Sequence, residues 1–301
     1  MQQQQQQCLK RSLPFERVVA ALGDDPDPDL VRYVARLAGR EDQMEIRFIQ
    51  ILEQTANVAR TLLKLRESVE VQFGAPPRTH KILCNAAYGT GIKGVLDAAS
   101  ESQADVMVVR KRNGREADLR QCLRHNCGAV WILPEGAVTA PDRILAVAGD
   151  LPDSVAGLEA AAAISRHWGI QECVVLRPYF NESGHDCSHC ERQAQWSAEQ
   201  ACCHLVAQFD SLGGLQFRPA VEQGAVLANV IERAAAREGS KLVVMTSPSC
   251  TPVAAALLNG DIEKAIERLS VPVLVVKQPG EQIGFLGALK CIHRRPEPQF
   301  G

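Results

Sequence analysis

One short polar segment carries the residue types that bind zinc or undergo thiol redox chemistry. It reads His185-Asp186-Cys187-Ser188-His189-Cys190, so that one histidine precedes a Cys-x-x-Cys pair and another lies within it. Thiolate and imidazole are ligands of tetrahedral zinc sites, and paired cysteines can also form a reversible disulfide. The segment therefore indicates a zinc site, a redox-active pair at Cys187 and Cys190, or an exposed loop without a cofactor. The candidate zinc ligands are His185, Cys187, His189 and Cys190.

A second group of such residues, Cys202-Cys203-His204, lies too far along the chain to complete that site. If residues 191–211 form one helix, Cys190 and Cys202 lie about 18 Å apart at a rise of about 1.5 Å per residue. One tetrahedral ion cannot bridge that distance. Helical spacing with nearby apolar residues instead predicts that Cys202 and Cys203 face the core. Those apolar residues are Trp196, Ala201, Leu205 and Val206.

A basic turn formed by Arg110, Lys111, Arg112 and Arg115 is the clearest candidate for contact with an anion or RNA. Single-stranded nucleic acids also require aromatic side chains on which bases stack, and none is interleaved here. We therefore expect a solvated loop and no nucleic-acid partner. No nucleophile elbow, zinc-protease motif or paired carboxylates occur either, so the sequence indicates no enzymatic activity.

Two strand-turn-helix segments, 126 residues apart, organise the chain. Residues 17–38 and residues 143–164 each contain an apolar run, a Gly-Asp-x-Pro-Asp turn and a helical pattern. Self-similarity on this scale indicates duplicated domains, each with its own core. We predict a disordered Gln-rich tail, two domains and a C-terminal tail at residues 1–12, 13–136, 141–278 and 279–301.

Short apolar runs alternate with helical patterns in both halves. Runs such as residues 106–109 and 242–245 are typical of strands buried on both faces, which occur in parallel sheets covered by helices. The alternation predicts, in each half, a doubly wound, mostly parallel five-stranded α/β sheet with flanking helices. The predicted strands are residues 17–22, 45–51, 81–87, 106–109, 129–133, 143–148, 172–176, 216–221, 242–245 and 271–276.

This order of elements, with the sequence Ala-Asp-Val-Met-Val-Val at residues 104–109 and Val-Pro-Val-Leu-Val-Val at residues 271–276, resembles the universal stress protein family. Residues 143–147 are similar to the first strand of that family, and residues 263–268 to its last helix. The resemblance covers nearly the whole chain and implies the tandem form. It implies two adenine-nucleotide-hydrolase-like domains packed as an intrachain pseudo-dimer, and it allows a homodimer of chains.

In nucleotide-binding members the loop after the fourth strand reads G-x2-G-x9-G-[ST], so that the backbone wraps the phosphates. In the second half Thr246 replaces the first glycine, Asp261 replaces the hydroxyl residue, and two prolines remove N–H donors. The first half lacks the long loop, and Asp24 and Asp150 stand near the family's nucleotide-contacting Asp. The resemblance implies a weakened nucleotide site formed by Asp150, Thr246, Ser247, Gly260 and Asp261.

Composition narrows the class of partner. The chain has 301 residues, and its 33 Lys and Arg nearly balance 35 Asp and Glu, so no global field attracts nucleic acid or membrane. The odd number of cysteines, eleven, indicates reduced and mostly buried thiols. The start lacks the apolar core of a secretory signal and no run is long enough to span a bilayer, so we expect a soluble, cytoplasmic protein.

From these observations we expect a non-enzymatic universal-stress-like protein that acts in stress response or regulation by binding an unknown protein partner, without a cofactor. Two alternatives stay open. The second half could bind ATP or another adenine nucleotide, or the Cys187 and Cys190 loop could serve as a zinc or redox sensor.

Overall fold

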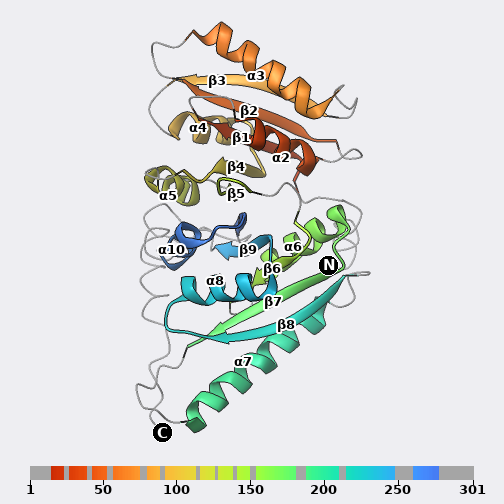
Figure 1. The fold of residues 1–301 in the computed structure, drawn as a ribbon, viewed down its shortest axis with the longest axis vertical. Helices are drawn as coiled ribbons and strands as arrows, with labels where there is room; N and C mark the ends of the chain where they lie inside the picture. Colours follow the sequence, from red (N-terminus) through yellow and green to blue (C-terminus); the bar gives the residue numbers. More distant parts are fainter. Residues whose placement is uncertain are drawn as a thin grey trace. The chain divides into compact units, whose positions relative to one another are not determined.

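The computed structural model describes thirteen stretches of the chain, and Figure 1 shows their arrangement. These stretches are residues 15–23, 27–38, 43–52, 57–74, 80–88, 92–112, 116–125, 128–137, 141–149, 154–180, 188–209, 215–247 and 260–277. The chain divides into two compact units. One is Met1–Ala140 with Ser270–Leu274, and the other is Pro141–Leu269 with Val275–Gly301.

The first unit contains a parallel sheet with the strand order β3-β2-β1-β4-β5. Its elements are β1 (Arg17–Leu22), α2 (Pro28–Ala38), β2 (Glu45–Leu52), α3 (Val58–Phe73), β3 (Lys81–Tyr88), α4 (Lys93–Glu101), β4 (Val106–Arg110), α5 (Glu116–His125) and β5 (Ala129–Leu133). Residues of β1, β4 and β5 are almost all buried, as expected for apolar strands with helices on both faces.

The second unit repeats this order as β10-β9-β6-β7-β8, with parallel pairing of β9, β6, β7 and β8. Its elements are β6 (Ile144–Val147), α6 (Val155–Trp168), β7 (Glu172–Tyr179), α7 (Ser188–Phe209), β8 (Gln216–Gln223), α8 (Leu227–Glu238), β9 (Leu242–Ser247), α10 (Gly260–Arg268) and β10 (Val273–Lys277). The predicted pair of doubly wound five-stranded sheets is confirmed. The domain limits and the pseudo-dimer packing stay predictions.

The strand order determines where a ligand can reach each sheet. In the first unit the chain moves outward from β1 to β3 and then returns to the other side of β1 at β4. Helices α2 and α3 pack against each other on one face, and α4 and α5 follow on the other (Figure 1). The loops after β1 and β4 therefore diverge and leave a crevice at the carboxyl ends of these strands. The same reversal occurs between β6 and β9.

Helix α7 presents a narrow apolar stripe to its sheet. Cys202, Leu205 and Val206 are buried, whereas Trp196 is 62% exposed and Cys203 is exposed. The expectation that Trp196 and Cys203 face the core is therefore wrong. Each residue turns the helix by about 100°, so Cys203 lies one step outside the stripe and Trp196 lies far round the helix from Cys202.

Candidate functional site

The crevice of the first unit contains an ion pair between Asp27 and Arg110. Asp27 precedes α2, and its Oδ1 accepts a hydrogen bond of 2.9 Å from the backbone N–H of Leu30. Arg110 is the last residue of β4, and its Nε and Nη2 donate to the two Asp27 oxygens, each at 2.8 Å. Its Nη1 also donates to the backbone carbonyl of Pro134 at 3.0 Å. The guanidinium therefore connects the N-terminus of α2 with the ends of β4 and β5.

This ion pair is shielded from water, since the side chains of Arg110 and Asp27 are only 10% and 18% exposed. Burial alone would raise the pKa of Asp27, but hydrogen bonds from Arg110 and Leu30 and the charges of Arg110 and Arg112 outweigh it. The net effect is a lowered pKa, so Asp27 is an anion at neutral pH. Its carboxylate occupies the N-terminus of α2, where the helix dipole favours negative charge.

Two further side chains close the end of β1. A Cβ built on Gly23 would lie 2.0 Å from Nη1 of Arg112, so the Arg112 guanidinium lies directly against the backbone at Gly23. From the neighbouring strand β2, the buried side chain of Gln50 donates a hydrogen bond to the Gly23 carbonyl. Arg112 and Gln50 therefore both contact the backbone at Gly23 in the described part of this crevice.

The expectation of a solvated basic loop at Arg110, Lys111 and Arg112 is wrong for Arg110. Its partner Asp27 lies 83 residues earlier in the sequence, so no local pattern indicates the pair. Lys111 and Arg112 are half-buried rather than free in solvent. The other two residues named at this end of the fold, Asp24 and Arg115, lie outside the described residues.

The charge state of Asp27 makes stability depend on pH. Folding lowers the pKa of Asp27, so its ionised form stabilises the folded protein. This contribution is fully present above the ordinary carboxyl pKa of about 3.9. It is lost as the pH falls through the folded-state pKa. Asp27→Asn keeps the helix cap but removes the charge. At pH 7 we expect it to reduce the free energy of unfolding by about 1.5–3 kcal/mol. Urea unfolding of both proteins should show this difference shrinking below about pH 4.

In the second unit the structure describes four of the five residues implied in nucleotide binding. Thr246 and Ser247 end β9, and Gly260 and Asp261 begin α10, whereas Asp150 lies outside the described residues. Ser247 is buried, and Nζ of Lys277, the last residue of β10, lies 3.4 Å from its Oγ. Sequence reasoning missed Lys277, although its place directly after an apolar run marks it as a strand-end cation.

Two side chains donate hydrogen bonds to the backbone at the end of β6. The Gly149 carbonyl accepts hydrogen bonds from Arg177 Nη1 at 2.6 Å and from Ser154 Oγ at 3.1 Å.

Thr246 packs closely against helix α6. A Cβ on Gly157 of α6 would lie 2.4 Å from Oγ1 of Thr246, so this hydroxyl points at the helix backbone. Thr246 therefore fills space between β9 and α6 where a smaller residue would leave room.

Gly157→Ala tests this close packing. Alanine normally stabilises a helix interior by about 0.5–1 kcal/mol relative to glycine. Here the added methyl would meet a β-branched side chain that is stiff about χ1, and we expect a net loss of about 1–3 kcal/mol. In the double variant Gly157→Ala/Thr246→Ala the loss should largely disappear, because the next nearest atom lies 3.7 Å away. Additive losses in thermal unfolding would contradict this arrangement.

No protein-family profile matches the chain, and no curated protein matches it in sequence. Among solved structures, a universal stress protein of Pseudomonas aeruginosa UCBPP-PA14 is similar with a TM-score of 0.63 at 16% identity, covering 88% of this chain and 94% of that one. The chain has the universal stress protein fold. The alignment covers more of the chain than either unit alone contains, so the fold is present in its tandem form.

Two more structures with a similar fold cover nearly all of this chain. A functionally unknown protein of Pseudomonas aeruginosa PAO1 aligns with a TM-score of 0.62 at 15% identity, over 88% of this chain and 94% of its own. A universal stress protein of Archaeoglobus fulgidus DSM 4304 aligns with a TM-score of 0.56 at 14% identity, over 89% and 98%. The resemblance in the order of strands and helices is thus confirmed at the level of the universal stress protein fold.

The candidate zinc ligands are only partly described. His189 and Cys190 lie in the first turn of α7 and are exposed, whereas His185 and Cys187 lie outside the described residues. Within the part of the chain that the structure describes, no three His, Cys, Asp or Glu side chains are grouped to hold a metal. The zinc or redox site stays a prediction, which metal analysis of protein purified without added zinc would test.

Thiol labelling should separate two classes of cysteine in this universal stress fold. Cys122, Cys173 and Cys202 are buried, and burial raises the pKa of the Cys173 thiol to about 12. Cys190 and Cys203 are exposed. With iodoacetamide and peptide mass mapping, we expect the exposed pair to react at least about tenfold faster than the buried three. Similar rates for both classes in native protein would show that α7 is not packed as described.

Proposed function

We propose that this chain is a non-enzymatic universal-stress-type protein that acts in stress response or regulation by binding a protein partner, and that its first unit does not bind nucleotide. The single observation that carries the proposal is the Asp27–Arg110 ion pair in the crevice between β1 and β4. This is the crevice in which doubly wound proteins bind their ligands. Here it contains its own anion and its own cation.

A phosphate would enter this crevice at a high cost. It would have to approach the Asp27 carboxylate, which already caps α2, and compete with it for Arg110. Separating a shielded, bidentate pair leaves an uncompensated charge, which costs about 3–5 kcal/mol where the pair is fully buried. Phosphate binding would have to offset that cost before any net affinity remained. A closed crevice favours a scaffold for protein contacts over a nucleotide switch.

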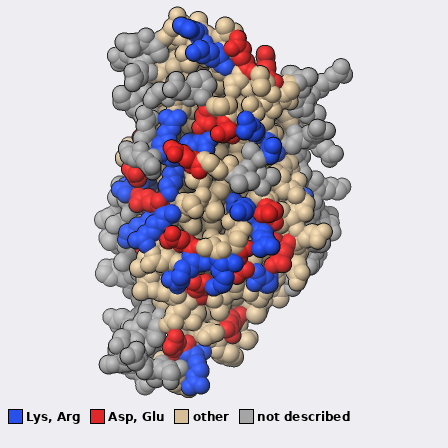
Figure 2. Space-filling view, in the orientation of Figure 1, with Lys and Arg blue, Asp and Glu red and all other residues tan. Residues whose placement is uncertain are grey.

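The surface supports a protein partner rather than nucleic acid. Lys and Arg alternate with Asp and Glu over the face shown in Figure 2, which fits the near-neutral net charge of the chain. Nucleic-acid binding requires a basic stripe or patch instead. Among the described helices, none combines the length and apolarity needed to cross a bilayer.

A thermal shift assay with ATP and Mg²⁺, ADP and inorganic phosphate tests the proposal. A ligand at a hundred times its Kd adds about 2.7 kcal/mol to stability, which raises the melting temperature by several degrees. We expect no shift with any of the three at millimolar concentration. Stabilisation by ATP that is lost in Arg110→Met would place the nucleotide in the first unit and contradict the proposal.

The second candidate function is binding of ATP or another adenine nucleotide by the second unit. The specific observation that favours it is the cation Lys277 beside Ser247 at the carboxyl end of β9. Asp261 and the close packing of Thr246 against Gly157 oppose it. Stabilisation by ATP in the wild type and in Arg110→Met, but not in Lys277→Met, would establish this alternative.

A further inference from the structure

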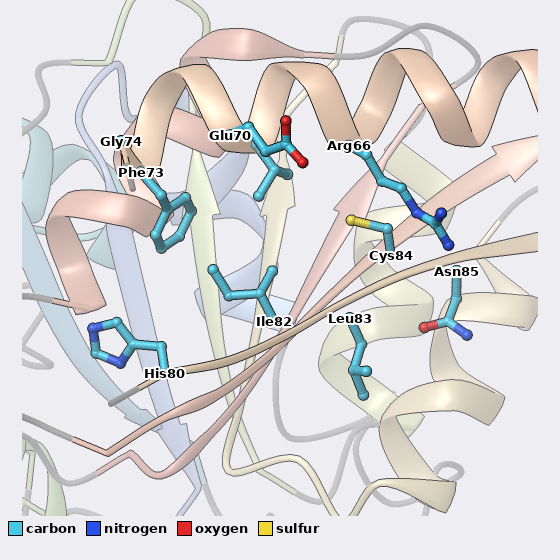
Figure 3. Close-up of a pocket in the computed structure, with 10 residues that line it drawn as sticks. Arg66, Glu70, Phe73, Gly74, His80, Ile82, Leu83, Cys84 and Asn85 are labelled. Carbon is cyan, nitrogen blue, oxygen red and sulfur yellow. The ribbon is translucent and has the colours of Figure 1, made fainter. Parts of the chain in front are cut away.

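A cavity of about 510 Å³ lies in the first unit, away from the crevice between β1 and β4. It opens beneath α3 along β3, the strand at the end of the sheet order. Figure 3 shows the two walls: Arg66, Glu70 and Phe73 project from the helix, and Ile82 and Cys84 from the strand. Its volume is within the range of small-molecule sites, which is about 300–1,000 Å³.

Apolar side chains, together with His80, line one end of this cavity. Val69 and Phe73 line it from α3, and Ile82 lines it from β3. Phe73 is held in place by an edge-to-face contact with Phe48 of β2, with ring centroids 6.1 Å apart. Phe73 and Ile82 are still half-exposed. An apolar group placed here would remove both side chains from water and gain from their burial.

The other end carries a cation. In Figure 3 the Arg66 side chain reaches past Cys84 toward Asn85, whereas the Glu70 carboxylate stays beside α3. Arg66 forms no ion pair or hydrogen bond with any residue of the described stretches. Burial raises the pKa of the neighbouring Cys84 thiol, so that this thiol is neutral and does not compete for the guanidinium. The guanidinium fork is suited to a planar, two-oxygen anion.

We propose that this cavity binds a small monocarboxylate with an apolar chain or ring. The carboxylate pairs with Arg66, and the apolar part lies against Phe73 and Ile82. The cavity has a cation at one end and an exposed apolar wall at the other. A molecule that joins an anion to an apolar group complements both ends. The crevice at Asp27 plays no part, so the proposal stands apart from the function proposed above.

Isothermal titration of octanoate into the full chain is the first test. We expect saturable binding that weakens about tenfold, or about 1.4 kcal/mol, in Arg66→Gln. The matched control is Lys64→Gln, which removes a cation from the same helix about 200° away round its axis. That variant should change affinity less than twofold. Absence of saturable binding, or equal weakening by both substitutions, would overturn the proposal.

Two probes that each carry one part of the ligand separate the two contributions. Acetate carries the carboxylate without the tail, and 1-octanol carries the tail without the charge. Each should bind at least about tenfold more weakly than octanoate if both ends of the cavity contribute. Equal binding of 1-octanol and octanoate would show that Arg66 is not a ligand and would overturn the proposal.

Alkylation of Cys84 locates the bound molecule independently of affinity. Cys84 lines the cavity, whereas Cys203 is exposed on α7 in the other unit. Saturating octanoate should slow iodoacetamide labelling of Cys84 at least about fivefold, because only the small fraction of protein without ligand reacts. The labelling rate of Cys203 should not change. Binding without protection of Cys84 would place octanoate elsewhere and contradict the assignment.

Discussion

Arg110→Met should reduce the free energy of unfolding by about 3 kcal/mol, because it leaves the Asp27 carboxylate shielded from water without its partner. Methionine retains most of the apolar stem, so the loss reports the guanidinium rather than the packing of the chain. Urea unfolding followed by circular dichroism measures the difference. This guanidinium joins the end of β4 to the start of α2 through Asp27 and to the end of β5 through Pro134, which is why a single charge is expected to matter so much.

A matched control is available on the neighbouring helix. Arg32 forms an ion pair with Asp29 at 3.0 Å, but both side chains are exposed, at 44% and 64%. Arg32→Met should therefore cost less than about 0.5 kcal/mol. If Arg110→Met and Arg32→Met had the same small effect, the pair at Arg110 would be open to solvent and the crevice would not be closed.

The second large effect is expected at Trp131, at the centre of β5. This side chain is fully buried and contacts Phe15 and Tyr33 edge to face, with centroids 6.4 Å and 5.9 Å apart. Trp131→Ala would leave a cavity that its neighbours cannot fill, and we expect a loss of about 3–5 kcal/mol. Thermal unfolding of the purified variant measures it. If alanine prevents expression, Trp131→Phe should still fold, with a smaller loss.

The corresponding control is Trp196→Ala on α7. Trp196 is 62% exposed, so its removal should change stability by no more than about 0.5 kcal/mol. A large loss at Trp196, or a negligible loss at Trp131, would reverse the assignment of surface and core in these two elements.

The fold was predictable from sequence because its signal is local. Runs such as residues 106–109 and 242–245 contain only apolar residues, and each is short and followed by a helical pattern. They form β4 and β9, buried as expected for parallel strands. Because the strand-turn-helix pattern recurs 126 residues later, the sequence also predicted a second sheet of the same kind. Helix faces were less predictable, as Trp196 and Cys203 show, because apolar residues on α7 occur on more than one side.

The candidate site was only partly predictable because its contacts are not local. Asp27 and Arg110 meet across 83 residues of sequence, at the carboxyl ends of strands that neighbour each other only in the folded sheet. A usable signal did exist: Arg110 directly follows an apolar strand, and Asp27 follows the turn after β1. Topology places both at one edge of the sheet. The cavity beneath α3 had no such signal, since it depends on how far a helix stands from β3.

Titration calorimetry of the full chain with ATP and Mg²⁺ tests the central claim most directly. With the crevice of the first unit filled by Asp27 and Arg110, we predict no saturable heat up to about 1 mM nucleotide, corresponding to a binding free energy weaker than about −4 kcal/mol. A one-site isotherm with a Kd near 10 μM that is lost in Arg110→Met but retained in Lys277→Met would contradict the account, because it would place the nucleotide in the first unit. It would show that this tandem universal stress fold acts through nucleotide after all.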